Sequence, residues 1–146
     1  MTIFSDEYFM QIAINQAKEA KEKGEIPVGA IVVANNQIIA KSHNLTELLH
    51  DVTAHAEIQA ISAAANYLNA KYLKNCTLYV TLEPCQMCAG ALYWSQISHI
   101  VCGAEDSKRG YRAFGCKLHP KTTIKYGVLE EECRNLMIEF FTKKRT

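Results

Sequence analysis

The chain of 146 residues is 49% hydrophobic and 21% charged, which predicts one domain, 1–146, with one sizeable core. Its longest apolar run, 28–34, is far shorter than the roughly 20 residues of a transmembrane helix, and the acidic start lacks an export signal. We therefore expect a cytoplasmic protein with no membrane partner. The net charge of +1 conceals a balance of −4 in 1–105 and +5 in 106–146, so the second part is a candidate polyanion-facing surface or an ordinary solvated face.

The predicted elements alternate along the chain. Apolar residues at helical spacing predict an amphipathic helix between an N-cap at Ser5 and Gly24. Two strands, 28–34 and 37–42, are joined by Asn35-Asn36 in a predicted hairpin. Further on we predict a helix at 56–70, a strand at 76–82, a helix at 85–94, a strand at 97–104 and a helix at 130–144. This alternation implies parallel pairing and one α/β domain with a mixed sheet and helices on both faces.

Two short segments carry the residues suited to chemistry, His55-Ala56-Glu57 and the segment 84–88, each at a predicted helix start. Cys85 and Cys88 are three residues apart and point to one side, and a helix N-terminus favours their thiolates. With His55 they provide three ligands for Zn²⁺, which leaves a fourth position for water, as in catalytic sites. Glu57 is suited to a proton shuttle if His55 sits at the very edge of the helix.

Other interpretations of these segments exist. The two cysteines alone also fit a redox pair or half of a closed four-cysteine zinc site, but the closed site would need a second pair that the sequence lacks. For Glu57 the alternative is a solvated glutamate in the first turn of a helix. The unpaired cysteines are expected to be packed or surface thiols; they are Cys76, Cys102, Cys116 and Cys133.

His-x-Glu followed by Pro-Cys-x-x-Cys resembles the signature of the zinc-dependent nucleobase deaminases. The resemblance to the bacterial tRNA-specific adenosine deaminases extends over nearly the whole chain. Its matching pieces are IPVGAIVV at 26–33, HN at 43–44, HDVTAHAE at 50–57, TLYVTLEPCQMCAGA at 77–91, GAEDSKRG at 103–110, and Phe140-Phe141 with Lys143-Lys144-Arg145 in the last helix. The chain departs from the common family pattern at Val52, where proline is usual, and at 111–115, where small residues are usual.

This resemblance implies an α/β fold, a three-layer α/β/α sandwich of the cytidine-deaminase-like kind with a central mixed five-stranded sheet. It implies one Zn²⁺ per chain, held by His55, Cys85 and Cys88. It also implies that adenosine at the wobble position of a tRNA anticodon stem-loop is converted to inosine. Hydroxide would attack C6, Glu57 would shuttle the proton and ammonia would leave.

The resemblance extends to substrate contacts and assembly. It implies substrate-binding roles for Asn44, Pro27, Val28, Ala56, Asp106 and Lys108. Expected RNA contacts are Arg109, Tyr111, Arg112, Phe141, Lys143, Lys144 and Arg145, because aromatic and arginine side chains in a basic segment suit stacking on unpaired bases. A homodimer is implied as well.

Two other functions remain open at this point. A deaminase of a free base or nucleoside, of the guanine or cytosine type, would use the same metal chemistry without a basic surface. A metal-stabilised RNA-binding module would need no catalysis, and Glu57 argues against it because a structural zinc does not use a proton shuttle.

Overall fold

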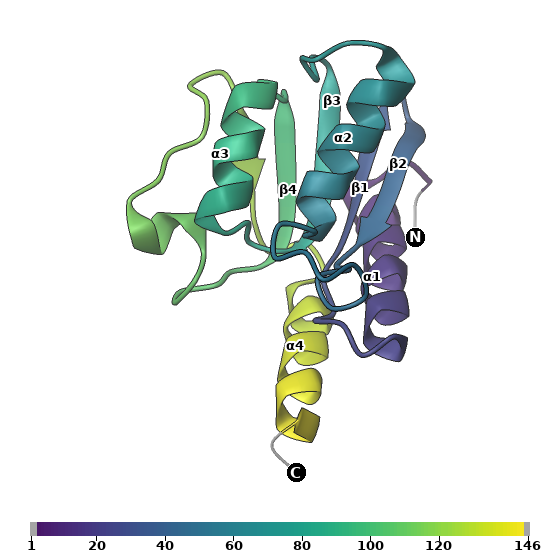
Figure 1. The fold of residues 1–146 in the computed structure, drawn as a ribbon. Coiled ribbons are helices and arrows are strands. Elements are labelled where there is room, and N and C mark those ends of the chain that lie inside the picture. The colour runs from purple at the N-terminus through teal and green to yellow at the C-terminus, as the bar shows by residue number, and fades with distance from the viewer. Residues whose placement is uncertain (1–2, 145–146) are drawn as a thin grey trace.

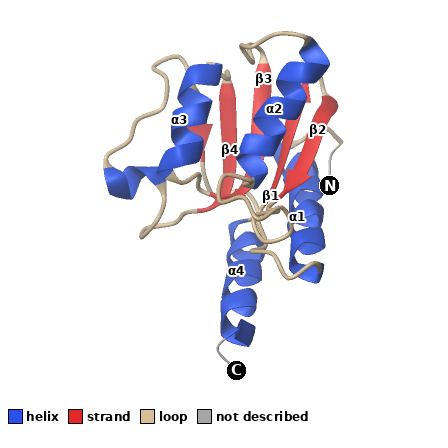
Figure 2. Ribbon diagram, viewed as in Figure 1, coloured by secondary structure: helices blue, strands red, loops and turns tan. Residues whose placement is uncertain are grey.

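The computed structural model describes residues 3–144 and has three layers, with a sheet between two layers of helices (Figure 1, Figure 2). Helices α2 and α3 cover one face of the sheet, and α1 covers the other. The elements in chain order are α1 (Asp6–Glu22), β1 (Gly29–Ala34), β2 (Gln37–His43), α2 (Ala56–Leu68), β3 (Cys76–Leu82), α3 (Gln86–Ser95), β4 (His99–Ala104), the 3₁₀ turn η1 (Tyr111–Phe114), β5 (Thr123–Lys125) and α4 (Glu130–Lys144).

The five strands lie in the order β2-β1-β3-β4-β5. β1 is antiparallel to both β2 and β3, whereas β3, β4 and β5 run parallel. Asn35 and Asn36 both have positive φ, as the tight turn of the predicted hairpin requires. The mixed five-stranded sheet is therefore confirmed, and its fifth strand lies in a segment where the sequence pattern predicted no element.

Successive residues of β1 enter different cores, because neighbouring side chains of a strand point to opposite faces. Ala30 and Val32 pack toward α2 and α3, in a core that includes Ala60, Ala64, Leu78 and Leu92. Ile31 and Val33 pack toward α1, in a core that includes Met10, Ile14, Ala17 and Val101. Helices on both faces of the sheet thus follow from a strand with apolar residues at consecutive positions.

Helix α1 begins where the sequence predicts. The Ser5 hydroxyl accepts a hydrogen bond from the Tyr8 N–H at 3.1 Å and caps the helix. The helix then lies directly on Gly29 at the start of β1. A Cβ there would overlap the Ala13 carbonyl oxygen and lie 2.5 Å from the Ala17 nitrogen. The close approach of α1 to the sheet requires glycine at this position.

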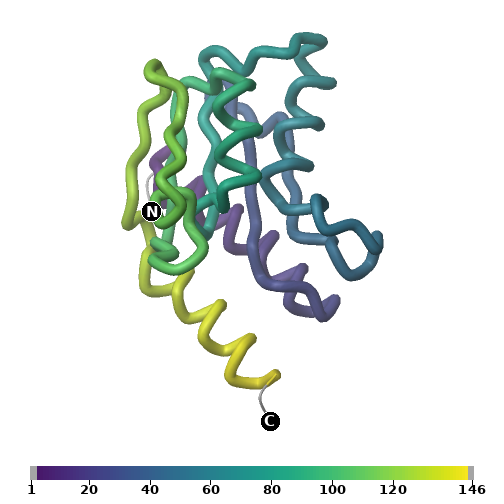
Figure 3. The backbone as a smooth tube through the Cα atoms, turned by 60° about the vertical axis from the view of Figure 1, so that its left-hand side comes forward, coloured from purple at the N-terminus to yellow at the C-terminus, as the bar shows by residue number. Residues whose placement is uncertain are grey.

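The N-terminal ends of α2 and α3 lie at the same edge of the sheet, and α4 begins near that edge and extends away from it (Figure 1, Figure 3). Three segments distant in sequence therefore meet at one place. Among residues 3–144 no helix combines the length and apolar character needed to cross a membrane.

Candidate active site

Three metal-binding side chains meet at the N-terminal ends of α2 and α3. His55 is the N-cap of α2, Cys85 is the N-cap of α3, and Cys88 lies in the first turn of α3. The His55 Nδ1 atom is 3.6 Å from the Cys85 Sγ atom and 3.5 Å from the Cys88 Sγ atom. All three donor atoms lie within 4.8 Å of one another. The structure thus brings together the three predicted ligands.

This donor set fits Zn²⁺. Tetrahedral zinc, with nitrogen at about 2.0–2.1 Å and sulfur at about 2.3 Å, places the two kinds of donor about 3.6 Å apart, which matches both distances in the structure. Two helix N-termini face the donors, and their dipoles favour thiolates. A hydrogen bond from Cys88 lowers the pKa of Cys85 to about 4. Three protein ligands leave a fourth position for water.

Hydrogen bonds fix the segment that carries His55. The Gln59 amide donates to the His43 carbonyl at 2.8 Å and to the Ala54 carbonyl at 3.1 Å. One turn earlier the Ser42 hydroxyl donates to the Ala56 carbonyl at 2.6 Å. His55 therefore has extended backbone angles immediately before the first helical residue, as the proton-shuttle prediction required.

Glu57 lies in the first turn of α2 and is only 4% exposed, so it is not a solvated surface glutamate. Burial raises the pKa of Glu57 to about 7, and the negative charge on Cys85 contributes to the increase. A carboxyl group with this pKa can accept and return a proton near neutral pH.

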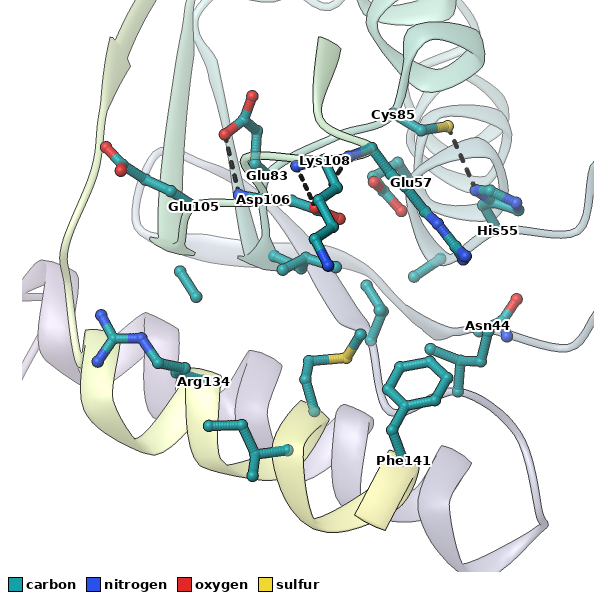
Figure 4. Close-up of a pocket in the computed structure, with 18 of the residues that line it drawn as sticks. Asn44, His55, Glu57, Glu83, Cys85, Glu105, Asp106, Lys108, Arg134 and Phe141 are labelled. Atoms are coloured by element: carbon teal, nitrogen blue, oxygen red, sulfur yellow. Dashed lines mark hydrogen bonds between the residues drawn. The ribbon is translucent and has the colours of Figure 1, made fainter. Parts of the chain in front are cut away.

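A cavity of about 460 Å³ separates this cluster from α4, a size typical of small-molecule sites (Figure 4). Glu57, His55 and Cys85 lie along one side of it, and α4 with Phe141 lies along the other. The residues that line it are Ile26, Val28, Asn44, Thr46, His55, Ala56, Glu57, Leu82, Glu83, Cys85, Ala104, Glu105, Asp106, Lys108, Arg109, Arg134, Met137, Ile138 and Phe141. Five of the six predicted substrate-binding residues are among them.

Asn44 lines this cavity and has a buried side-chain oxygen without a hydrogen-bond partner among the described residues. Its side chain is largely buried, and its Nδ2 donates to the Thr46 hydroxyl at a long 3.4 Å. Its Oδ1 accepts no hydrogen bond from any residue in 3–144. Since buried amide oxygens are normally paired, this atom is suited to accept a hydrogen bond from a ligand in the cavity.

Pro27, Tyr111 and Arg112 are not among the residues that line the cavity. Pro27 is fully buried. Tyr111 is 6% exposed, and its hydroxyl lies 2.7 Å from that of Tyr126. Its ring is therefore packed inside the protein, and the prediction that it stacks on RNA does not fit. Arg112 binds the Glu83 carboxylate, an ion pair that the sequence pattern did not predict.

The basic excess beyond residue 105 is divided between ion pairs and the cavity. Lys125 pairs with Asp6 at 2.7 Å, and Arg134 pairs with Glu130 one turn away. Lys108 and Arg109 line the cavity. Lys143 and Lys144 face a separate hollow between α4 and α1, and Arg145 lies outside the described residues.

Several residues that line the cavity were missed by the sequence analysis. Arg134, Met137 and Ile138 share one face of α4 with Phe141, which was predicted as an RNA contact, and their helical spacing, with Ile138 largely exposed, was an available signal. Glu83 could have been recognised as a lone carboxylate at the end of an apolar strand, immediately before Pro84.

Comparisons with known proteins agree with this geometry. Residues 4–104 match the family model of the cytidine and deoxycytidylate deaminase zinc-binding region. The tRNA-specific adenosine deaminase of Aquifex aeolicus is 46% identical over 144 residues, which cover 95% of each chain. A solved structure from work on A-to-I editing by tRNA:A34 deaminases at the wobble position of transfer RNA has a TM-score of 0.82 and 39% identity. That match covers 88% of this chain and 98% of the other.

A second structure is relevant to the alternative function. The guanine deaminase of Bacillus subtilis has a TM-score of 0.69 and 36% identity, and the match covers 77% of this chain and 70% of that one. The family match spans the three zinc-ligand candidates and Glu57, and the fold is shared with both solved structures. The chain therefore belongs to the zinc-binding cytidine and deoxycytidylate deaminase family.

Proposed function

We propose that this protein is a tRNA-specific adenosine deaminase that converts adenosine to inosine at the wobble position of an anticodon stem-loop. The observation that carries this proposal is the similarity to a tRNA-specific adenosine deaminase over 95% of both chains. The cavity assigned to the base is lined by the loop 105–109, beside the zinc ligands, and by α4 on the opposite wall.

The reaction consumes one water molecule and releases ammonia. When bound by His55, Cys85 and Cys88, Zn²⁺ supplies a Lewis acid that makes water a nucleophile near neutral pH. Glu57 takes a proton from the attacking water and delivers it to N1 of the adenine ring. It then carries a second proton to the departing amino group as the bond between C6 and nitrogen breaks.

Other residues of the cavity bind and orient the base. Val28 and Ala56 provide an apolar surface beside Glu57, and the unpaired Asn44 Oδ1 accepts a hydrogen bond from the nucleotide. Lys108 and Arg109 lie at the cavity, where cationic side chains attract the phosphates that flank the target base (Figure 4). Lys143 and Lys144, which face the separate hollow between α4 and α1, provide a second positive surface for the tRNA.

We also propose that two copies of the chain associate through the side that carries α2 and α3. Large apolar side chains are exposed there, among them Trp94 at 76% and Tyr67 at 63%. Sedimentation of the protein and of Trp94→Glu should show a dimer and a monomer, respectively; a monomeric parent protein would contradict the proposal. A tRNA substrate agrees with the predicted cytoplasmic location.

The function is tested by incubating the zinc-loaded protein with an anticodon stem-loop that has adenosine at the wobble position and measuring inosine. A stem-loop with that adenosine moved by one position is the matched control and should remain unchanged. The Michaelis constant for the stem-loop should rise steeply with salt, because phosphate contacts release counterions. Turnover of free guanine or cytosine without turnover of the stem-loop would favour the alternative function.

A further inference from the structure

Arg112 is held by two acidic residues and one aromatic ring. Its Nε donates to Glu83 Oε2 at 3.2 Å, and its Nη2 donates to Glu83 Oε1 at 2.8 Å. Nη2 also lies 3.4 Å from Glu105, and the guanidinium group lies 4.1 Å from the centre of the Tyr126 ring. A two-point pair with a carboxylate is among the strongest and most directional ion pairs in proteins.

The Glu83 carboxylate that receives Arg112 is buried beneath the loop 105–112. It also accepts the Asp106 N–H at 3.1 Å and the Arg112 N–H at 3.4 Å. The loop backbone passes so close that a Cβ on Gly110 would overlap the carboxylate. Burial raises the pKa of Glu83, but the Arg112 hydrogen bonds and the two N–H groups lower it below its ordinary value, so the group is a carboxylate at neutral pH.

The same loop is joined to the segment that carries a zinc ligand. The Tyr111 N–H donates to the Pro84 carbonyl at 2.8 Å, and Cys85 forms an isolated β-bridge with Gly110. The Glu83–Arg112 pair therefore lies where the cavity-lining loop meets the metal-ligand segment.

The loop in turn places charged groups at the cavity. The Asp106 side chain accepts the N–H groups of Lys108 and Arg109 at 3.2 and 3.0 Å, which fixes the turn that carries these two side chains (Figure 4). Asp106 itself is held by Glu83 through its own N–H. The positions of Lys108 and Arg109 thus depend on a backbone that Glu83 and Arg112 hold.

We propose that Arg112 is a positioning residue, which through Glu83 holds the loop 105–110 in the conformation that binds substrate, and that it is not an RNA contact. The kinetic part of this proposal rests on the proposed function. Without Arg112 the buried Glu83 carboxylate loses its cationic partner, and the loop above it must shift or admit water.

The first test is the kinetics of Arg112→Ala on the stem-loop. We expect the Michaelis constant to rise about 10-fold, as for loss of a charged hydrogen bond, with kcat changed less than about twofold. Arg112→Lys should have a Michaelis constant almost as high as that of Arg112→Ala, because an ammonium group cannot form both hydrogen bonds to Glu83. Lys117→Ala is the matched control: it removes one exposed positive charge of the same segment and should leave both constants unchanged.

The variant Glu83→Gln distinguishes a positioning role of Arg112 from direct contact between Arg112 and RNA. If Arg112 acts through Glu83, this variant raises the Michaelis constant as Arg112→Ala does, and the double variant adds nothing further. If Arg112 binds RNA directly, Glu83→Gln releases it and leaves the constant unchanged or lower. In that case Arg112→Ala reduces the slope of log affinity against log salt by about 0.7. Either of these results would overturn the proposal.

A second readout does not depend on activity. Trypsin should cleave after Lys108 and Arg109 faster in Arg112→Ala and Glu83→Gln than in the parent protein. Lys117→Ala should be cleaved at the parent rate. All four proteins should bind one zinc per chain and have the same circular dichroism spectrum. Equal cleavage rates would refute the positioning role. A parent protein that makes no inosine would refute the proposed function while leaving this proteolysis test valid. If Arg112→Ala does not fold, the kinetic and proteolysis measurements are made on Glu83→Gln and Arg112→Lys instead.

Discussion

Replacement of Asn44 by leucine should affect stability and activity differently. The side chain has one long hydrogen bond, to Thr46, and an unpaired buried oxygen, and such a group costs about 1–3 kcal/mol of desolvation. Leucine has a similar shape and no polar atoms, so the free energy of unfolding should stay equal or rise by up to about 2 kcal/mol. The substrate, however, loses a buried hydrogen bond. At about 1–3 kcal/mol this loss lowers kcat/KM by roughly 5- to 150-fold.

Both quantities are measurable on the same preparation, by urea unfolding of the zinc-loaded protein and by inosine formation on the stem-loop. Asn66→Leu, an exposed substitution of the same kind in α2, should leave kcat/KM unchanged and alter stability by no more than about 0.5 kcal/mol. Asn44→Leu could instead lose more than about 1 kcal/mol of stability and keep its kcat/KM. The Asn44 amide would then have a structural role, and the reasoning from its unpaired oxygen would be refuted.

Three further substitutions test other parts of the structure. Glu57→Gln should lower kcat by about 10²- to 10⁴-fold in the inosine assay while metal analysis still finds one zinc per chain; near-normal turnover would exclude the proton-shuttle role. Gly29→Ala should destabilise the protein by about 1–3 kcal/mol in urea unfolding, because its Cβ overlaps the Ala13 carbonyl, whereas Gly90→Ala, in open space on α3, should not destabilise it. Since the pKa of Glu83 is lowered in the folded protein, its stabilising contribution is present above the unfolded pKa of about 4.3 and is lost as the pH falls through the lower folded value. The free energy of unfolding, measured between pH 3 and pH 7, roughly the range over which carboxyl groups titrate, should therefore fall less on acidification in Glu83→Gln than in the parent protein. Parallel curves of this free energy against pH for the two proteins would contradict the prediction.

The chemistry of the site could be predicted from the sequence because its determinants are local. Cys85 and Cys88 lie on one turn, and His55 and Glu57 lie within three residues at a helix start. Short-range spacing decides which of these side chains share a side, so the pattern predicted the zinc ligands and the proton shuttle without knowledge of the fold. The long helices and the four longer strands were predictable for the same reason.

Long-range contacts decided what the sequence could not predict. Arg112 was expected to contact RNA because it lies in a basic segment, yet its partner Glu83 is 29 positions away. Tyr111 is buried by Tyr126, which is placed next to it only when β5 joins the sheet. β5 itself has three residues, too few for a periodic pattern to be detected. The role of α4 as a cavity wall depends on where the helix docks.

The order of these parts along the chain affects how such an enzyme can be altered. The reactive groups lie between His55 and Cys88, whereas the opposite wall of the cavity comes from one face of α4, which begins at Glu130. One wall of the substrate cavity is thus encoded in a stretch of sequence separate from the reactive groups. Variation on this face of α4 can change the shape of the cavity while the zinc ligands keep their geometry, and a diversified library confined to Arg134, Met137, Ile138 and Phe141 should retain zinc in most of its members.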